Sequence, residues 1–107
     1  MNQLVKNLSQ GSHPVILGGP SPDASALQQR IEEIGYVFIK FTDTRGGTDL
    51  GVRVDKAATN LSAADFSLPQ GSVHIEGTLT LDYVPVRCIA DIDLATGKGT
   101  GRLIVQA

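Results

Sequence analysis

The 107-residue chain has few of the residues from which a metal centre or a disulfide is built. It has one cysteine, Cys88, so it forms no internal disulfide and offers no zinc site made from several thiolates. No metal site and no cofactor are therefore expected. The alternation of neighbouring residues places Cys88 on the apolar side of a strand, where we expect a buried and unreactive thiol.

Basic stripes and long apolar runs are also missing. The nine lysines and arginines are spread along the chain and the net charge is −2, so nucleic acid is not an expected partner. The longest apolar runs are far shorter than the roughly 20 residues that span a membrane. The first residues lack the apolar stretch of a secretory signal. We therefore expect a cytoplasmic protein without a membrane contact.

What the chain does have is the composition of a folded domain. It is 41% hydrophobic and 19% charged, which gives enough apolar area to offset the entropy of the unfolded chain. The length fits one core, because compact domains cluster near about 100 to 150 residues. We expect residues 1–107 to form a single α+β domain.

Residues 22–34 carry the clearest helix pattern. Ser21 can cap the free amides, Pro22 suits the first helical position, and Gly35 suits a left-handed C-terminal cap. Apolar residues recur at intervals of three and four, as expected for a helix with one buried face. This stripe consists of Ala24, Leu27, Ile31 and Ile34.

Apolar and polar residues alternate through most of the remaining chain, which indicates strands. Glycine-rich turns at 44–48 and 96–100 join two pairs of them as hairpins. The expected fold is α+β, with a mostly antiparallel five- or six-stranded sheet and one helix packed on one face. The predicted strands cover residues 15–17, 36–41, 50–55, 73–76, 78–83, 87–94 and 102–106.

Residues 57–71 are expected to form a long connection. One helical turn in it is predicted to begin at Ser62 and to close at Asp65 in a capping box. Leu61, Phe66 and Leu68 are its candidates for burial in the core. The sequence leaves open whether this connection covers the second face of the sheet.

The turn before the predicted helix is the first candidate ligand site. Free amides and the helix dipole attract anions, and Gly18 and Gly19 would let a ligand approach closely beside Ser21. The segment matches neither common phosphate-binding pattern, and two prolines remove amides that such a cradle would use. An ordinary capped turn is the alternative interpretation.

A polar strand face is the second candidate. The side chains of His74, Arg87, Asp91 and Asp93 fall on the outer positions of two predicted strands. Two carboxylates spaced by two residues could share a proton or bind a cation, although an exposed antiparallel face often has this composition. The alternative is therefore a solvated surface.

A third candidate surface is apolar. Tyr36 and Phe38 lie opposite the main apolar set of their strand, and Ile89 and Ile104 are out of phase with theirs. If one helix covers only one sheet face, these four residues form an interface on the other face. A homodimer that buries this face is the expected arrangement, and a different protein partner would serve equally.

Two hypotheses of different classes remain. The first is a small non-enzymatic binding or accessory module that acts through protein contacts or self-association, favoured because no nucleophile with its base and no cofactor loop is recognisable. The second is a small-molecule-binding domain or a small enzyme of isomerase or cyclase type, with an apolar pocket and few polar residues. The residues leave open whether the chain is an enzyme and which partner or ligand it takes.

Overall fold

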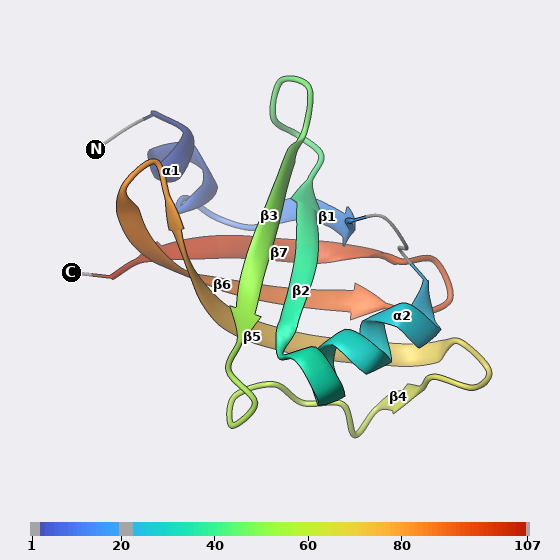
Figure 1. Cartoon of the computed structure of the whole chain (residues 1–107). Helices are drawn as coiled ribbons and strands as arrows, with labels where there is room; N and C mark the ends of the chain where they lie inside the picture. The colour runs from blue at the N-terminus through green and yellow to red at the C-terminus, as the bar shows by residue number, and fades with distance from the viewer. Residues whose placement is uncertain (1–2, 20–22, 107) are drawn as a thin grey trace.

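The strands of the computed structural model, which describes residues 3–19 and 23–106, close into a six-stranded antiparallel barrel (Figure 1). The order around the barrel is β1, β2, β3, β5, β6, β7 and back to β1. The short β4 pairs only with the beginning of β5. The elements are α1 (Gln3–Leu8), β1 (His13–Leu17), α2 (Ala24–Gln29), η1 (Arg30–Ile34), β2 (Tyr36–Phe41), β3 (Thr48–Val54), β4 (Ala64–Asp65), β5 (Gln70–Leu81), β6 (Val84–Asp93) and β7 (Lys98–Val105).

The closure of the sheet differs from the expected open sheet. β1 pairs with β7 from His13 opposite Gly101 to Ile16 opposite Lys98, which joins the first strand to the last. A closed sheet turns one face inward along its whole circumference, so that face needs no covering layer of helices. The predicted class and antiparallel pairing are therefore confirmed, whereas the single helix packed on one face of an open sheet is wrong.

The core is the inner face of this barrel. Val37, Ile39 and Phe41 of β2 are completely buried, as their period of two predicted. The two helices lie on opposite sides of the barrel (Figure 1) and add buried side chains to the same cluster, among them Val5 of α1 and Leu27 of α2. In the described ranges, no helix has the length and apolar character needed to cross a membrane.

The predicted helix forms, but its cap is a different residue. The carboxylate of Asp23 accepts a 2.8 Å hydrogen bond from the amide of Ala26, so Asp23 is the N-cap of α2. Ser21 and Pro22, which the sequence suggested for the start of the helix, lie outside the described residues. The cap type is the one expected, since Asp and Ser serve this position equally well.

The helix ends in a wider turn than predicted. η1 is a π-helix in which the amide of Gly35 donates to the carbonyl of Arg30 at 2.6 Å, and Gly35 adopts the predicted left-handed conformation (φ 74°). A π-turn advances fewer degrees per residue than an α-turn. Ile34 therefore leaves the buried stripe and is 64% exposed, which corrects its predicted place in the core.

The connection between β3 and β5 lacks the predicted helical turn. Asp65 belongs to β4, and its carboxylate accepts hydrogen bonds from the amides of Ser67 and Leu68 instead of closing a capping box at Ser62. Leu61 and Phe66 pack against the core, as expected, whereas Leu68 is exposed.

The predicted strands at 73–76 and 78–83 are one continuous strand, β5, which ends at Leu81. Asp82 and Tyr83 form the two-residue connection to β6, and both have positive φ (47° and 68°). Hairpin turns with this geometry match the strand twist and usually select Asn or Gly. Tyr83 is 99% exposed and lies outside β5, so the predicted strand over 78–83 ends two residues earlier than expected.

Candidate binding groove

The barrel wall is open along part of the seam between β3 and β5. These strands pair at two positions only, Arg53 with Thr78 and Val54 with Gly77. Beyond these pairs the two strands diverge, and β3 continues toward Thr48 without a second neighbour on this side (Figure 1). A gap therefore lies between β3 and the hairpin of β5 and β6.

The direction of the backbone groups at this gap follows from the register. The amide of Asp55 donates to the carbonyl of Glu76 at 2.8 Å, so these two residues direct their backbone groups across the seam. Backbone groups point to alternate sides along an antiparallel strand. Gly51 and Thr80 therefore also point across the seam, and both lie beyond its last pair. Each presents an N–H and a C=O that no neighbouring strand takes up.

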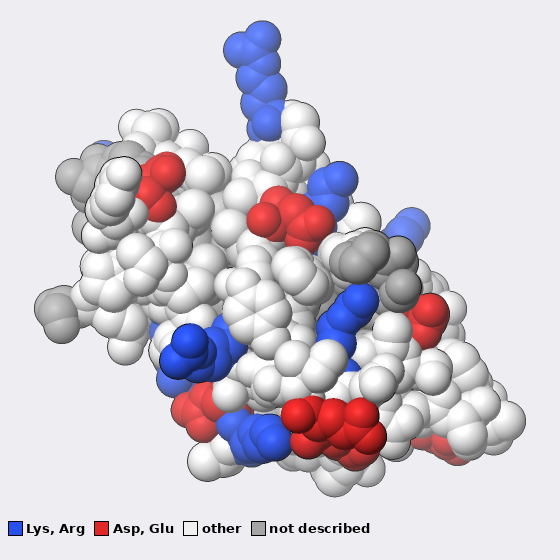
Figure 2. Space-filling view, viewed as in Figure 1, with Lys and Arg blue, Asp and Glu red and all other residues white. Residues whose placement is uncertain are grey.

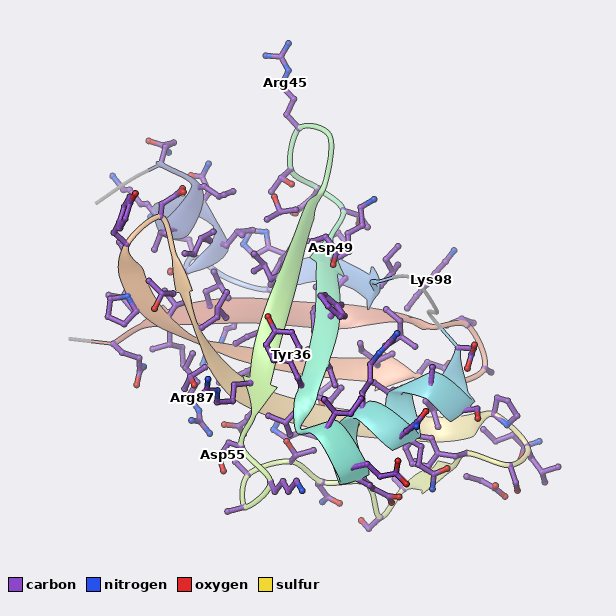
Figure 3. All side chains as sticks on the ribbon, in the orientation of Figure 1. Tyr36, Arg45, Asp49, Asp55, Arg87 and Lys98 are labelled. Atoms are coloured by element: carbon purple, nitrogen blue, oxygen red, sulfur yellow. The ribbon has the colours of Figure 1, made fainter. Side chains whose placement is uncertain are left out.

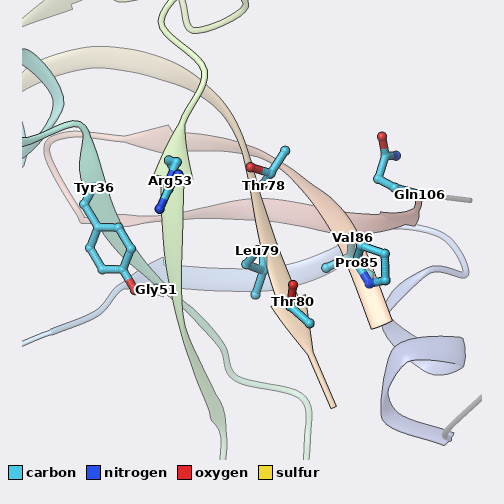
Figure 4. Close-up of a pocket in the computed structure, with 9 residues that line it drawn as sticks. All are labelled: Tyr36, Gly51, Arg53, Thr78, Leu79, Thr80, Pro85, Val86 and Gln106. Atoms are coloured by element: carbon cyan, nitrogen blue, oxygen red, sulfur yellow. The ribbon is translucent and has the colours of Figure 1, made fainter. Parts of the chain in front are cut away.

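A groove with a volume of about 660 Å³ lies over the gap (Figure 4). Its apolar part is formed by the half-buried Leu79, the exposed Pro85 and Val86, which is buried on the inner face of β6. This volume falls in the range of about 300 to 1,000 Å³ that is typical of ligand pockets. The remaining lining residues are Tyr36, Gly51, Arg53, Thr78, Thr80 and Gln106.

Among the described residues, the polar lining of the groove contains one basic side chain and no acidic one. Arg53 is exposed, and the hydroxyls of Tyr36, Thr78 and Thr80 share the lining with it. The Tyr36 hydroxyl lies above Gly51, where an added Cβ would be 2.0 Å from its oxygen. The groove therefore offers hydrogen-bond donors around a single positive charge.

A chain of hydrogen-bonded charges crosses the wall next to the groove. Arg87 is placed between Asp55 (2.8 Å) and Glu76 (3.0 Å), and Figure 3 shows Arg87 beside Asp55. His74 continues the chain, with Nε2 2.6 Å from Glu76 and Nδ1 2.7 Å from Asp91. Acidic and basic side chains are likewise interspersed on the face seen in Figure 2. Within the cluster, each of the two basic side chains is paired with two carboxylates.

The chemistry of His74 follows from its two partners. A carboxylate oxygen only accepts hydrogen bonds, so both ring nitrogens donate when the ring is protonated. The hydrogen bond to Glu76, followed by the one to Asp91, raises the pKa of His74 above its ordinary value. The hydrogen bond from His74, followed by the one from Arg87, lowers the pKa of Glu76. Both ring nitrogens of His74 therefore lie within hydrogen-bond distance of a carboxylate of the same cluster.

The second histidine has a similar environment at another place. His13 Nδ1 lies 2.8 Å from Asp43, and Nε2 lies 2.9 Å from the carbonyl of Gln10. Both partners are acceptors, and the hydrogen bond to Asp43 is the main cause that raises the pKa of His13. His13 is separate from the groove and from the charge cluster around His74.

The residues of the predicted polar face are brought together only in part. His74, Arg87 and Asp91 belong to one network, as their shared strand face suggested. Asp93 does not belong to it, because its carboxylate accepts a hydrogen bond from the amide of Ala95 in the following turn.

The predicted ligand turn lies elsewhere on the wall. The amide of Gly18 donates to the carbonyl of Phe38 at 2.9 Å, and the amide of Gly19 donates to the carboxylate of Asp49 at 3.3 Å. The two amides that an anion would use therefore already have acceptors within the chain. Ser21, the third residue of this site, lies outside the described residues.

The four residues of the predicted interface lie on the outside of the barrel rather than on one face of an open sheet. Tyr36 is 41% exposed and borders the groove. Phe38 is partly covered, with the Arg30 guanidinium 5.6 Å from its ring centre and Tyr36 packed edge-on against it. Ile89 and Ile104 are half-buried on β6 and β7. Of these four, only Tyr36 lines the groove, and their role as an interface stays a prediction.

Sequence reasoning missed most of the groove and one end of the charge cluster. Asp55 follows β3 and reaches Arg87 because β3 and β5 meet at the seam, a contact between distant segments. Arg53 and the threonines at 78 and 80 resemble ordinary outer strand positions. The only signal available was the alternation that places Gly51, Arg53 and Asp55 on the same outer face.

Comparison with known proteins adds no assignment. The sequence matches no protein-family model, and no curated protein is similar to it.

Proposed function

We propose that the chain is a small non-enzymatic binding module that acts through protein contacts, and that the groove at the β3–β5 seam receives an extended segment of a protein partner. The observation that carries this proposal is the open seam, where Gly51 and Thr80 present unpaired backbone groups on both sides of a groove. Unpaired strand edges are templates for another strand. When an extended peptide adds to such an edge, backbone hydrogen bonds provide the affinity and pockets for alternate side chains provide the specificity.

The lining of the groove suits this kind of ligand. Leu79 and Val86 give an apolar floor for one side chain of the segment, and Tyr36 stands at the rim as a partly exposed aromatic residue. Aromatic residues at the centre of an interface often carry much of its binding energy. Gly51 has no side chain, and the end of the Tyr36 side chain lies over it on the outer face of the wall.

The proposal of a binding role rather than a catalytic one is supported by the two histidines. Both ring nitrogens of His74 and of His13 have acceptor partners within the chain. A general base needs a free nitrogen within hydrogen-bond reach of its substrate. Neither ring offers one.

A small-molecule site is the second candidate, and the groove itself favours it. Arg53 beside three hydroxyls above an apolar floor is a combination that also fits a small carboxylic acid. The same groove would then take a compact anion in place of a strand. Hydrogen exchange of the Gly51 and Thr80 amides separates the two candidates, because only a bound strand would form hydrogen bonds with both amides and slow the exchange of both.

We also propose a cytoplasmic location. The chain has one cysteine and therefore no internal disulfide, a pattern common in reducing compartments. Cys88 is a buried free thiol.

A peptide-display selection on the immobilised chain tests the proposed function. A library of random linear peptides is selected in parallel on the wild-type chain and on Gly51→Trp. In this variant the indole would displace the end of the Tyr36 side chain and occupy the groove. We expect peptides that bind the wild type and not the variant. On the ¹⁵N-labelled wild type, these peptides should shift the amide signals of Gly51 and Thr80 and slow their hydrogen exchange.

Ala95→Trp is the matched control, because Ala95 is exposed in the turn between β6 and β7, has no positive φ and does not line the groove. Sedimentation of the chain alone identifies a second copy as the partner if the wild type dimerises and Gly51→Trp does not. If no selected peptide distinguishes the wild type from Gly51→Trp and the chain is monomeric, the proposal is wrong.

A further inference from the structure

We infer that the segment received at the seam is acidic and places a carboxylate against Arg53. This inference rests on the proposed function and adds the chemistry of the partner. It starts from a difference between the two arginines on this part of the barrel wall.

Arg87 is paired with two carboxylates, Asp55 at 2.8 Å and Glu76 at 3.0 Å. Arg53, which lies on the neighbouring strand and pairs with Thr78, forms no ion pair with any carboxylate of residues 3–19 and 23–106. Its side chain is exposed and borders the groove. Of the two guanidinium groups, that of Arg53 is therefore the one without a carboxylate partner among the described residues, and it is exposed to a ligand in the groove.

The surroundings of Arg53 match a carboxylate rather than another acceptor. No acidic side chain of the described residues lines the groove, in which Arg53 is paired with Thr78 of β5 and with Tyr36 of β2, whose hydroxyl extends over Gly51. A guanidinium binds a carboxylate through two parallel hydrogen bonds, and hydroxyls can donate to the remaining lone pairs. A basic ligand would meet the same charge without a counterion and would be repelled.

The position of this carboxylate on the partner follows from the strand geometry. A segment that forms hydrogen bonds with Gly51 continues the sheet, and its side chains alternate between the two faces of the wall. Side chains on the outer face come next to Arg53, and those on the inner face point toward Leu79 and Val86. We therefore expect an acidic residue flanked by apolar residues along the segment.

The peptides selected on the wild-type chain test this inference directly. We expect the groove-dependent peptides to be enriched in Asp or Glu next to apolar residues. Replacing the acidic residue of one such peptide by its amide should weaken binding about tenfold, because a charge-assisted bidentate contact is much stronger than a neutral one. Arg53→Gln should weaken the acidic peptide by a similar factor and leave the amide peptide unchanged.

Arg102→Gln is the matched control, since Arg102 is an exposed arginine on the outer face of β7 and does not line the groove. It should not alter either affinity. Arg53→Glu should in turn favour a peptide in which lysine replaces the acidic residue. Binding of that lysine peptide would also show that the variant is folded.

The possible failures are distinct. Groove-dependent peptides without acidic enrichment, or with equal affinity for wild type and Arg53→Gln, would overturn the acidic specificity and leave the binding role intact. Succinate that binds the groove as tightly as the acidic peptide would overturn the assignment of a peptide. The absence of any groove-dependent peptide would remove the proposed function together with this inference.

Discussion

Gly77 of β5 lies directly against the backbone of Arg53 of β3, so that a Cβ added at Gly77 would be 2.2 Å from the Arg53 carbonyl oxygen. Gly77 is buried and is paired with Val54. Glycine within a strand often marks such a close approach of two backbones. Because Gly77 has no side chain, β3 and β5 can approach closely enough to pair at this point.

We therefore expect Gly77→Ala to destabilise the barrel by about 1–3 kcal/mol, the usual cost of overpacking a tight contact. Urea unfolding gives the free energy of unfolding. Gly51→Ala is the control from the other strand of the same seam, because its added Cβ would meet only the end of the Tyr36 side chain, which can move outward. Equal stability of Gly77→Ala and wild type would contradict the tight seam.

The shift of the helix into a π-turn makes neighbouring isoleucines differ in their contribution to stability. Ile31 is 3% exposed and Ile34 is 64% exposed. We expect Ile31→Ala to cost about 2–5 kcal/mol, since lost transfer energy and a cavity add together, and Ile34→Ala to cost less than about 0.5 kcal/mol. Similar costs for both substitutions in chemical denaturation would place Ile34 back in the core.

Cys88 should be unreactive in the folded protein. Its side chain is 1% exposed, and burial raises its pKa to about 12, so the reactive thiolate is scarce at neutral pH. Labelling with a thiol reagent, followed by absorbance, should be slow in buffer and fast in denaturant. Rapid labelling of the native chain would mean that the inner face of β6 opens readily.

The charge cluster should make stability depend on pH. The folded state raises the pKa of His74, so its contribution is complete below the ordinary value of 6.5 and is lost as the pH rises through the higher folded pKa. The folded state lowers the pKa of Glu76, so that contribution is complete above 4.5 and is lost as the pH falls. The two contributions are present together between these ordinary values.

His74→Asn tests this expectation by urea unfolding at weakly acidic and weakly alkaline pH. The wild type should lose stability toward alkaline pH, and the variant should lose less. His13 also has a raised pKa and contributes in the same direction, so His13→Asn and the double variant separate the two histidines. An alkaline loss that is identical in His74→Asn and wild type would exclude His74 as its source.

Local features of the fold were predictable because neighbours in the sequence determine them. The alternation along β2 and β6 placed Phe41 and Cys88 inside correctly, and Gly35 and Gly97 mark the ends of elements with the positive φ that their turns need. The same alternation placed His74 and Arg87 on one outer face, where they share Glu76. Such patterns involve only a few consecutive residues.

The closure of the barrel and the groove depend instead on contacts between distant segments. No local pattern states that Gly77 will meet Arg53, or that the strands separate beyond that pair. The predicted uncovered sheet face assumed an open sheet, and the prediction of Ile34 in the core assumed a uniform α-helix. Both assumptions were reasonable locally and were overridden by tertiary packing.

The order of strands around the barrel has a kinetic consequence. β5 pairs with β6, and β6 with β7, each of which follows almost immediately in the chain, whereas the pairing of β1 with β7 joins His13 to Gly101. Closing so long a loop costs more chain entropy than forming a hairpin, and contacts of large sequence separation slow folding. The β1–β7 pairing should therefore form late, and substitutions there should affect the folding rate less than the unfolding rate.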